Sequence, residues 1–258
     1  MDLQAYLDRI DYHPPQGRQH LDLGRMHRQH LLHVPFENLS IHLGQPIDLS
    51  DEALFDKLVT RGRGGFCFEM NGLFRRVMEA YDLPVALLAC AVYSEERESF
   101  GLDFSHMALI VYYQYDYWLV DVGFGRSFPE PLRLMPHQIQ IMDGVRYQLA
   151  PEREGTIVVQ RSEGGKPYQP LYRFKRMAHQ FEEFFPMCQY HQTSPDSPFT
   201  QRRLISRLTA EGRVTLTGQV LKTTEGGSTL EQAVGSEADF ERWLQEYFGL
   251  DWQAMQWG

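Results

Sequence analysis

The sequence predicts an α+β protein in which helices come first, an antiparallel sheet or barrel follows, and a mixed segment ends the chain. In the first eighty or so residues, apolar side chains recur at the spacing of one helical face. Beyond Pro84, short runs rich in Val, Ile, Tyr and Phe alternate with polar turns, a pattern typical of antiparallel strands rather than βαβ units. A breaker-rich turn at residues 194–199 precedes the mixed segment.

The N-terminal region is predicted to form four helices with clear start and stop signals. Pro35 ends the second helix, and Ser50, followed by two acidic residues, caps the third. The fourth begins at Cys67 after a glycine-rich turn, and its broad apolar face predicts a buried helix. The predicted helices cover residues 3–10, 17–33, 51–60 and 67–81.

The central and C-terminal regions are predicted to contain strands, a linking helix and a terminal helix. Ser236, with acidic residues in the following turn, caps the terminal helix. The predicted central strands cover residues 84–93, 104–113, 117–122, 145–150, 156–161 and 167–174. The later elements are a linking helix at 178–191, strands at 213–216 and 219–223, and a helix at 236–248.

Composition and charge exclude several classes of function. The 258 residues are 43% apolar, which is typical of a folded chain with a sizeable core. A net charge of -9 without a segregated basic face disfavours nucleic acid as a partner. No Gly-Lys-Ser/Thr loop follows a strand, and no Gly-x-Gly-x-x-Gly opens a helix, so nucleotide hydrolysis and a dinucleotide cofactor lose support.

The sequence also predicts the compartment. The N-terminus carries no basic region followed by an apolar stretch, and we expect no signal peptide. The longest run without a charged or strongly polar residue in the first half, residues 83–93, is too short for the roughly 20 residues that span a bilayer, so no membrane partner is expected. Three cysteines are too few for a disulfide framework. These features favour a cytoplasmic protein. A monomer or a homodimer is expected, although none of these features distinguishes between the two.

Cys67 is the strongest candidate for a nucleophile. It lies at the predicted start of a buried helix, where backbone N–H groups and the helix dipole stabilise a thiolate and lower a thiol pKa. The competing interpretation is a small buried side chain without chemistry, which we expect for Cys90 and Cys188.

A nucleophile needs a base, and the base needs a partner that orients it. His106 opens one predicted strand, and Asp121 ends the next. A tight turn centred between residues 114 and 115 places both side chains on the same face of the hairpin. We therefore expect Asp121 to reach a ring nitrogen of His106, which makes Cys67, His106 and Asp121 a candidate catalytic triad.

Metal binding is a weaker interpretation. His27, His30 and His33 recur every three residues, but no Cys or carboxylate stands among them at a usual ligand spacing. We expect His30 to be half-buried on an apolar helix face, with the other two flanking it. A zinc site made of Cys67, His106 and Asp121 would require all three side chains to converge on one point, whereas catalysis requires them in a row.

Five blocks of sequence resemble the arylamine N-acetyltransferases. The blocks span residues 34–199 in the order found in that family. They are Val-Pro-Phe-Glu-Asn-Leu at 34–39, Arg-Gly-Gly-Phe-Cys-Phe-Glu at 63–69, His106 opening its strand, Asp-Val-Gly-Phe-Gly at 121–125, and Thr-Ser-Pro-Asp-Ser-Pro-Phe at 193–199.

The resemblance implies an α+β multidomain fold with a papain-like Cys, His, Asp triad. The implied domains are a helical domain at 1–83 carrying the nucleophile, an antiparallel β-barrel at 84–175 carrying His106 and Asp121, a linking helix at 176–193, and an α/β lid at 194–258. No cofactor is expected to be tightly bound. Acetyl-CoA would be a cosubstrate that donates its acetyl group to Cys67 in a ping-pong reaction.

The resemblance also assigns the acceptors and the binding residues. The acetyl group would pass to an arylamine, arylhydrazine or hydrazide nitrogen, or to an N-arylhydroxylamine oxygen. The glycine-containing run after Asp121 would let the backbone approach the CoA arm closely. The implied acceptor-binding residues are Phe36, Phe124 and Phe199. The implied cosubstrate-binding residues are Gly123, Gly125 and Arg126. The implied buried ion pair is Arg63 with Glu37.

Three other functions remain open at this stage. A cysteine hydrolase or transglutaminase-like enzyme would use the same triad with water or a lysine as acceptor. A related amide synthase would use the triad to close a ring. The non-enzymatic alternative is a binding module with an inert buried thiol.

Overall fold

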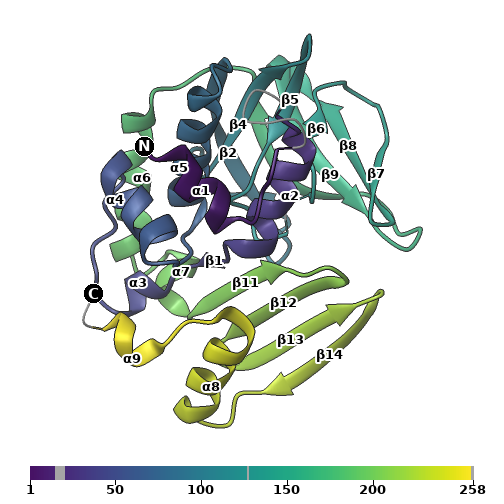
Figure 1. Cartoon of the computed structure of the whole chain (residues 1–258). Coiled ribbons are helices and arrows are strands. Elements are labelled where there is room, and N and C mark those ends of the chain that lie inside the picture. Colours follow the sequence, from purple (N-terminus) through teal and green to yellow (C-terminus); the bar gives the residue numbers. More distant parts are fainter. Residues whose placement is uncertain (15–20, 127, 257–258) are drawn as a thin grey trace.

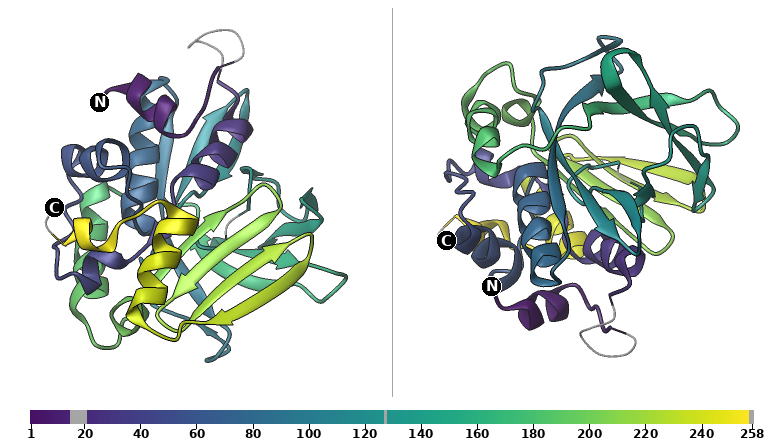
Figure 2. Two further views of the ribbon diagram at one scale, coloured as in Figure 1. Left: turned by 60° about the horizontal axis from the view of Figure 1, so that its bottom comes forward. Right: turned by 90° about the horizontal axis from the view of Figure 1, so that it is seen from above.

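The computed structural model describes residues 1–14, 21–126 and 128–256. N-terminal helices stand beside a curved antiparallel barrel, and a smaller sheet with its own helix lies against both (Figure 1). Seen from above, the strands of the larger sheet curl round beside the helices (Figure 2). This is the α+β arrangement that the sequence predicts.

Several of the N-terminal helices begin at side chains that cap their first turns. The Asp22 carboxylate accepts the Arg25 N–H at 2.9 Å, and the Ser50 hydroxyl accepts the Ala53 N–H. The helices are α1 (Leu3–Arg9), α2 (Leu23–His33), α3 (Leu39–His42), α4 (Asp51–Phe55), which continues as the π-helical turn η1 (Asp56–Thr60), and α5 (Cys67–Ala80). The predicted second helix starts later than residue 17 because Asp22 is extended and caps it; residues 17–20 lie outside the described chain.

Helix α5 is the central support of the site. Most of its residues are buried, including polar Glu69 and Asn71, and it packs against β4 of the barrel. Its apolar side chains belong to a core cluster shared with α1, α2 and the neighbouring strands. The broad apolar face read from the sequence therefore corresponds to a helix held between other elements.

The barrel contains nine antiparallel strands, with β3 pairing only with β2 and the others in the order β6-β5-β4-β2-β10-β9-β8-β7 among the described residues. The side chain of Gln140 joins the two end strands, because its amide accepts from the Arg133 N–H at 2.8 Å and donates to the Arg133 carbonyl at 3.0 Å. The strands are β2 (Val85–Ser94), β3 (Ser99–Phe100), β4 (His106–Tyr113), β5 (Asp116–Val120), β6 (Leu132–Arg133), β7 (Gln140–Met142), β8 (Val145–Pro151), β9 (Thr156–Ser162) and β10 (Gln169–Lys175).

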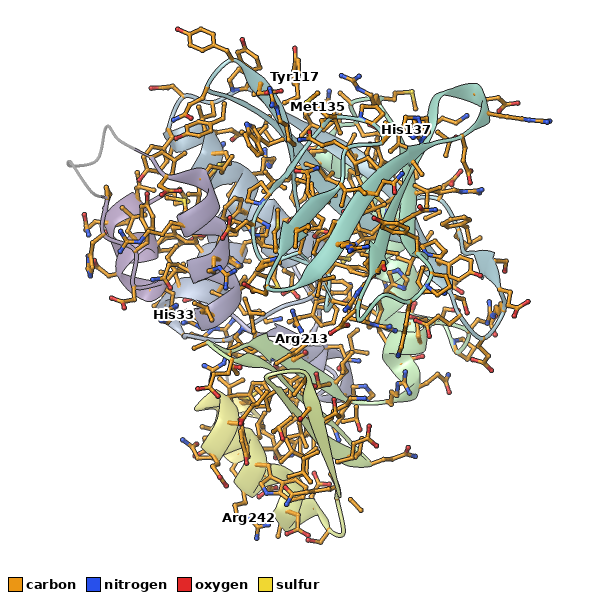
Figure 3. All side chains as sticks on the ribbon, turned by 90° about the vertical axis from the view of Figure 1, so that its right-hand side faces the viewer. His33, Tyr117, Met135, His137, Arg213 and Arg242 are labelled. Carbon is orange, nitrogen blue, oxygen red and sulfur yellow. The ribbon has the colours of Figure 1, made fainter. Side chains whose placement is uncertain are left out.

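The smaller sheet combines distant parts of the chain. Its strand order is β1-β11-β12-β13-β14, so Phe36 and Glu37 of the N-terminal region pair with β11. Arg213 on β12 lies where this sheet meets the barrel, and Arg242 lies at the far end (Figure 3). The elements are β1 (Phe36–Glu37), β11 (Leu204–Leu208), β12 (Gly212–Thr217), β13 (Val220–Glu225), β14 (Ser228–Ala233), α8 (Glu237–Phe248) and α9 (Trp252–Met255).

The segment between barrel and small sheet is helical, as predicted, but divided. A 3-10 turn, η3 (Phe181–Phe184), leads into α6 (Phe185–Thr193), and a short α7 (Pro198–Gln201) begins within the last two residues of the predicted breaker-rich turn. Across residues 1–14, 21–126 and 128–256, the helices are all too short or too polar to cross a bilayer.

Candidate active site

Cys67 is the first residue of α5, and close backbone packing fixes its place. The Glu69 carboxylate accepts the Phe66 N–H at 3.1 Å, which caps the helix immediately before the cysteine. A Cβ atom on Gly64 would lie 2.0 Å from the Pro35 carbonyl oxygen, so only glycine fits there. The loop before Cys67 is thereby held against the strand at Phe36.

His106 and Asp121 lie side by side, as the hairpin geometry predicts. Strands β4 and β5 pair from Leu109 with Val120 to Tyr113 with Asp116, a register that puts both side chains on one face. The distance from His106 Nε2 to Asp121 Oδ2 is 2.8 Å, and both side chains are buried. Because a carboxylate only accepts, Nε2 carries the proton and Nδ1 is left as the basic nitrogen.

The Asp121 carboxylate is stabilised as an anion. Burial alone would raise its pKa, but the charge and hydrogen bond of His106 lower it, together with donors at Asn71 and Gly123. Asn71 Nδ2 and the Gly123 N–H each donate to Oδ1 at 3.0 Å. Tyr172, also fully buried, faces this carboxylate; burial first, and then the negative charge of Asp121, raise the pKa of Tyr172.

Asn71 links the nucleophile helix to the hairpin. One helical turn after Cys67, it donates to the Met107 carbonyl at 2.6 Å as well as to Asp121, and its own oxygen accepts the Val122 N–H at 3.0 Å. The sequence analysis missed Asn71, although its place one turn after Cys67 puts it on the same side of the helix as the candidate nucleophile.

The protonation of Cys67 differs from the sequence-based expectation. Burial raises the pKa of the thiol, and the Asp121 charge raises it further, although backbone N–H groups of Met107 and Phe68 face the sulfur and lower it. The helix start alone therefore does not produce a thiolate. Burial likewise raises the pKa of Cys90, and raises that of Cys188 to about 12.

Gly123 lies directly against the nucleophile. A Cβ atom there would come within 2.6 Å of Asn71 Nδ2 and 2.7 Å of the Cys67 Cα. Gly125 has more room, since its nearest neighbour would be Phe36 at 4.0 Å. Arg126 is exposed and pairs with Glu95 at 2.8 Å.

The three expected acceptor-binding phenylalanines fall into two groups. The rings of Phe36 and Phe199 lie 6.0 Å apart, on the side of the helix start. Phe124 packs instead on His106 at 5.2 Å and on Tyr172 at 5.4 Å. Aromatic rings therefore lie both beside Phe66, which precedes Cys67, and against His106.

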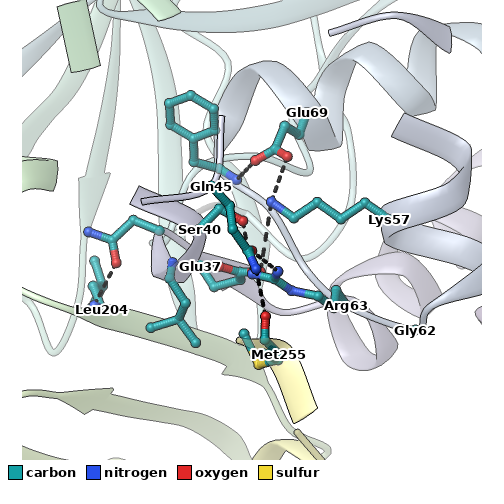
Figure 4. A network of polar contacts seen from close by, with 12 residues as sticks. Glu37, Ser40, Gln45, Lys57, Gly62, Arg63, Glu69, Leu204 and Met255 are labelled. Carbon is teal, nitrogen blue, oxygen red and sulfur yellow. Dashed lines mark hydrogen bonds and ion pairs between the residues drawn. The ribbon is translucent and has the colours of Figure 1, made fainter. Parts of the chain in front are cut away.

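A buried network of four charges lies beneath the start of α5 (Figure 4). The expected pair is present: Arg63 Nη2 donates to Glu37 Oε1 at 2.8 Å. The sequence missed a second pair, Lys57 with Glu69 at 2.6 Å, and Lys57 Nζ also lies 3.9 Å from Glu37. Because Glu69 caps the helix at Phe66, the network fixes the position of Cys67.

The α2 histidines are more deeply buried than expected. His27 and His30 are both fully buried. The sequence analysis expected a half-buried His30, with His27 and His33 flanking it. His30 bonds the Tyr6 hydroxyl at 2.8 Å, and His33 Nδ1 lies 2.9 Å from the Gln29 carbonyl oxygen. Within the described part of the chain, no three His, Cys, Asp or Glu side chains gather as metal ligands would.

The sequence of this chain is similar to those of known proteins. Residues 21–257 match the family model described as N-acetyltransferase. Arylamine N-acetyltransferase 1 of Homo sapiens is 30% identical over 277 residues, covering 98% of this chain and 95% of the relative. The Mycolicibacterium smegmatis arylamine N-acetyltransferase is 32% identical over 259 residues, covering 97% and 92%.

Solved structures agree in fold. Arylamine N-acetyltransferase from M. tuberculosis superposes with a TM-score of 0.90 at 32% identity, covering 99% of this chain and 95% of that one. The Mycobacterium marinum arylamine N-acetyltransferase in complex with CoA gives 0.87 at 31% identity, covering 96% and 92%.

Glu37→Gln is expected to lower the free energy of unfolding by roughly 3 kcal/mol, because it leaves Arg63 buried without its carboxylate. Denaturant unfolding measures this change. The matched control is Glu163→Gln, which removes an exposed partner of Arg161 and should cost only a few tenths of a kcal/mol. Equal, small changes in both variants would contradict a structural role for the buried pair.

Gly123→Ala is expected to destabilise the protein by about 1–3 kcal/mol, because the added methyl group overlaps Cys67 and Asn71. Gly125→Ala is the control, since its methyl group meets nothing closer than 4.0 Å. Thermal unfolding of both variants checks the difference, and equal stabilities would show that the loop does not pack on the nucleophile as described.

Proposed function

The chain belongs to the arylamine N-acetyltransferase family of acetyl-CoA-dependent acyltransferases, and on that premise we propose that it works by a ping-pong mechanism through Cys67. The acetyl group passes from acetyl-CoA to the Cys67 sulfur, and then to the nitrogen of an arylamine, arylhydrazine or hydrazide. The observation that carries the proposal is the buried hydrogen bond between His106 and Asp121, whose charge acts on the thiol of Cys67 at the start of α5.

His106 acts as the base and Asp121 as the group that orients it. With Nε2 donating to Asp121, His106 Nδ1 takes the proton of the Cys67 thiol. This transfer is needed because burial opposes ionisation of the thiol on its own. The thiolate therefore forms as a pair with the imidazolium, whose charge the Asp121 carboxylate stabilises.

The two half-reactions use the same proton carrier. In the first, the Cys67 thiolate attacks the acetyl carbonyl, the bond to the CoA sulfur breaks, and the imidazolium gives its proton to the departing CoA thiolate. In the second, the amine attacks the acetyl-cysteine and loses a proton to His106, and Cys67 leaves as the thiolate that pairs with the imidazolium. The backbone N–H of Cys67 serves as one donor to the oxyanion in both steps.

The binding residues follow from the two aromatic groups. Phe36 and Phe199 on one side, and Phe124 on the other, line the acceptor site near Cys67. Gly123 and Gly125 keep the following loop thin enough for the CoA arm to approach, with Arg126 at its exposed end.

We further propose O-acetylation of N-arylhydroxylamines, since a hydroxyl oxygen can replace the amine as nucleophile in the second step. We also propose the domain division at residues 83, 175 and 193, in which the helical domain supplies Cys67 and the barrel supplies His106 and Asp121. A role in xenobiotic metabolism follows from such acceptors.

Mixing the protein with acetyl-CoA alone is expected to add one acetyl group, mapped to the peptide that contains Cys67 and removed by aniline. Intact mass measurement followed by peptide digestion gives the result. Cys90 and Cys188 serve as internal controls, since burial keeps both protonated without a base. A label on either of them contradicts the proposal, and release of acetate without an amine favours a hydrolase.

Asp121→Asn is expected to lower turnover by at least about two orders of magnitude, because the amide no longer fixes the His106 tautomer or stabilises the imidazolium. The control is Asp143→Asn, which removes an exposed partner of Arg28. The measurement is the steady-state turnover of each folded variant relative to the unsubstituted protein. Near-normal turnover of Asp121→Asn would show that Asp121 does not belong to the triad.

A further inference from the structure

His27 is a fully buried histidine that the proposed chemistry does not use. It lies on α2, and its ring stacks on Phe128, with centroids 5.8 Å apart and planes 12° from parallel. The edge of the helix α5 residue Phe74 closes the other side at 6.2 Å. The ring is thus held in one orientation by packing.

Two hydrogen bonds show which ring nitrogen of His27 carries the hydrogen. His27 Nδ1 lies 3.0 Å from the Pro129 carbonyl oxygen, which can only accept, so Nδ1 carries the hydrogen. The Asp121 backbone N–H, which can only donate, points to His27 Nε2 at 3.3 Å. Both bonds exist together only in the neutral Nδ1–H form. Burial keeps the ring neutral, lowering the pKa of His27 to about 4.

The two partners stand at the two ends of one segment. Asp121 is the first residue after β5, and the pairing of β5 with β4 ends one residue earlier, at Val120. The backbone N–H of Asp121 donates to the His27 side chain. Pro129 lies eight residues later, after Gly123, Phe124, Gly125 and Arg126. A single side chain thus ties both ends of the segment that holds the catalytic carboxylate and the expected binding residues.

We propose that His27 is a positioning residue that fixes the Asp121 main chain, and through it the orientation of His106, by bonding both ends of segment 121–129. The inference rests on the proposed function in that its catalytic effect is exerted through the triad. His27 touches no reacting atom. Without the acceptor at His27 Nε2, the Asp121 main chain could rotate, and the carboxylate would then no longer meet His106 Nε2 at 2.8 Å.

The same helix offers a matched control. His30 lies one turn further along α2, is also fully buried, and also meets Phe74 edge-on at 5.5 Å. Its Nδ1 bonds the Tyr6 hydroxyl rather than segment 121–129. Substitution of His30 therefore reports the cost of changing a buried α2 histidine without disturbing Asp121.

The test compares His27→Asn, His27→Gln and His30→Asn. Asparagine places an amide where Nδ1 was and can still reach Pro129, but it is too short to accept from Asp121; glutamine reaches the Nε2 position. We expect the single-turnover acetylation rate of Cys67 to fall about tenfold in His27→Asn, the loss of one buried hydrogen bond. His27→Gln should recover to within about threefold of the unsubstituted protein, and His30→Asn should stay within about twofold.

A second measurement does not depend on acetyl transfer. Amide hydrogen exchange at Asp121, followed by NMR, should be at least about tenfold faster in His27→Asn than in the unsubstituted protein or His27→Gln. The inference is overturned if exchange at Asp121 is unchanged in His27→Asn, or if His30→Asn accelerates it equally. If exchange responds as expected but the unsubstituted protein is not acetylated, the proposed function fails and the positioning of Asp121 by His27 stands.

Discussion

The Asp121 carboxylate is buried as an anion, and the groups that stabilise it come from separate parts of the chain. Helix α5 supplies Asn71, strand β4 supplies His106, and the loop after β5 supplies the Gly123 N–H. A buried charge is tolerated only when its hydrogen bonds are complete, so these segments must assemble together. Because the Asp121 carboxylate needs hydrogen bonds from all of these segments, it sets the position of His106 relative to helix α5.

A second buried network fixes the nucleophile itself. Glu69 both pairs with Lys57 and accepts the Phe66 N–H, so the ion pair acts on the turn that carries Cys67. Glu37, from the strand that joins the small sheet, connects the same network to the rest of the fold through Arg63. Buried pairs of this kind add little net stability but make a particular arrangement specific, which is what a site of three separate side chains requires.

Much of the fold could be predicted because its signals are local. Helix caps, the apolar face of α5 and the register of one hairpin were enough to place His106 beside Asp121. Strand β14 was missed because all its residues are exposed, which leaves no alternation to detect. The Lys57–Glu69 pair and the contacts of Asn71 and His27 join distant segments, and local patterns carry no information about such partners. The Cys67 pKa was misjudged because the helix start was considered without the effect on the thiol of the burial that the apolar helix face predicts.

The central claim is that His106 ionises a thiol that its surroundings keep protonated. The pH dependence of Cys67 alkylation by iodoacetamide, followed on the Cys67 peptide in the unsubstituted protein and in His106→Ala, tests this most directly. The account predicts fast alkylation at neutral pH in the unsubstituted protein and, in His106→Ala, reactivity only under alkaline conditions. Coincident pH profiles for the two proteins would contradict it.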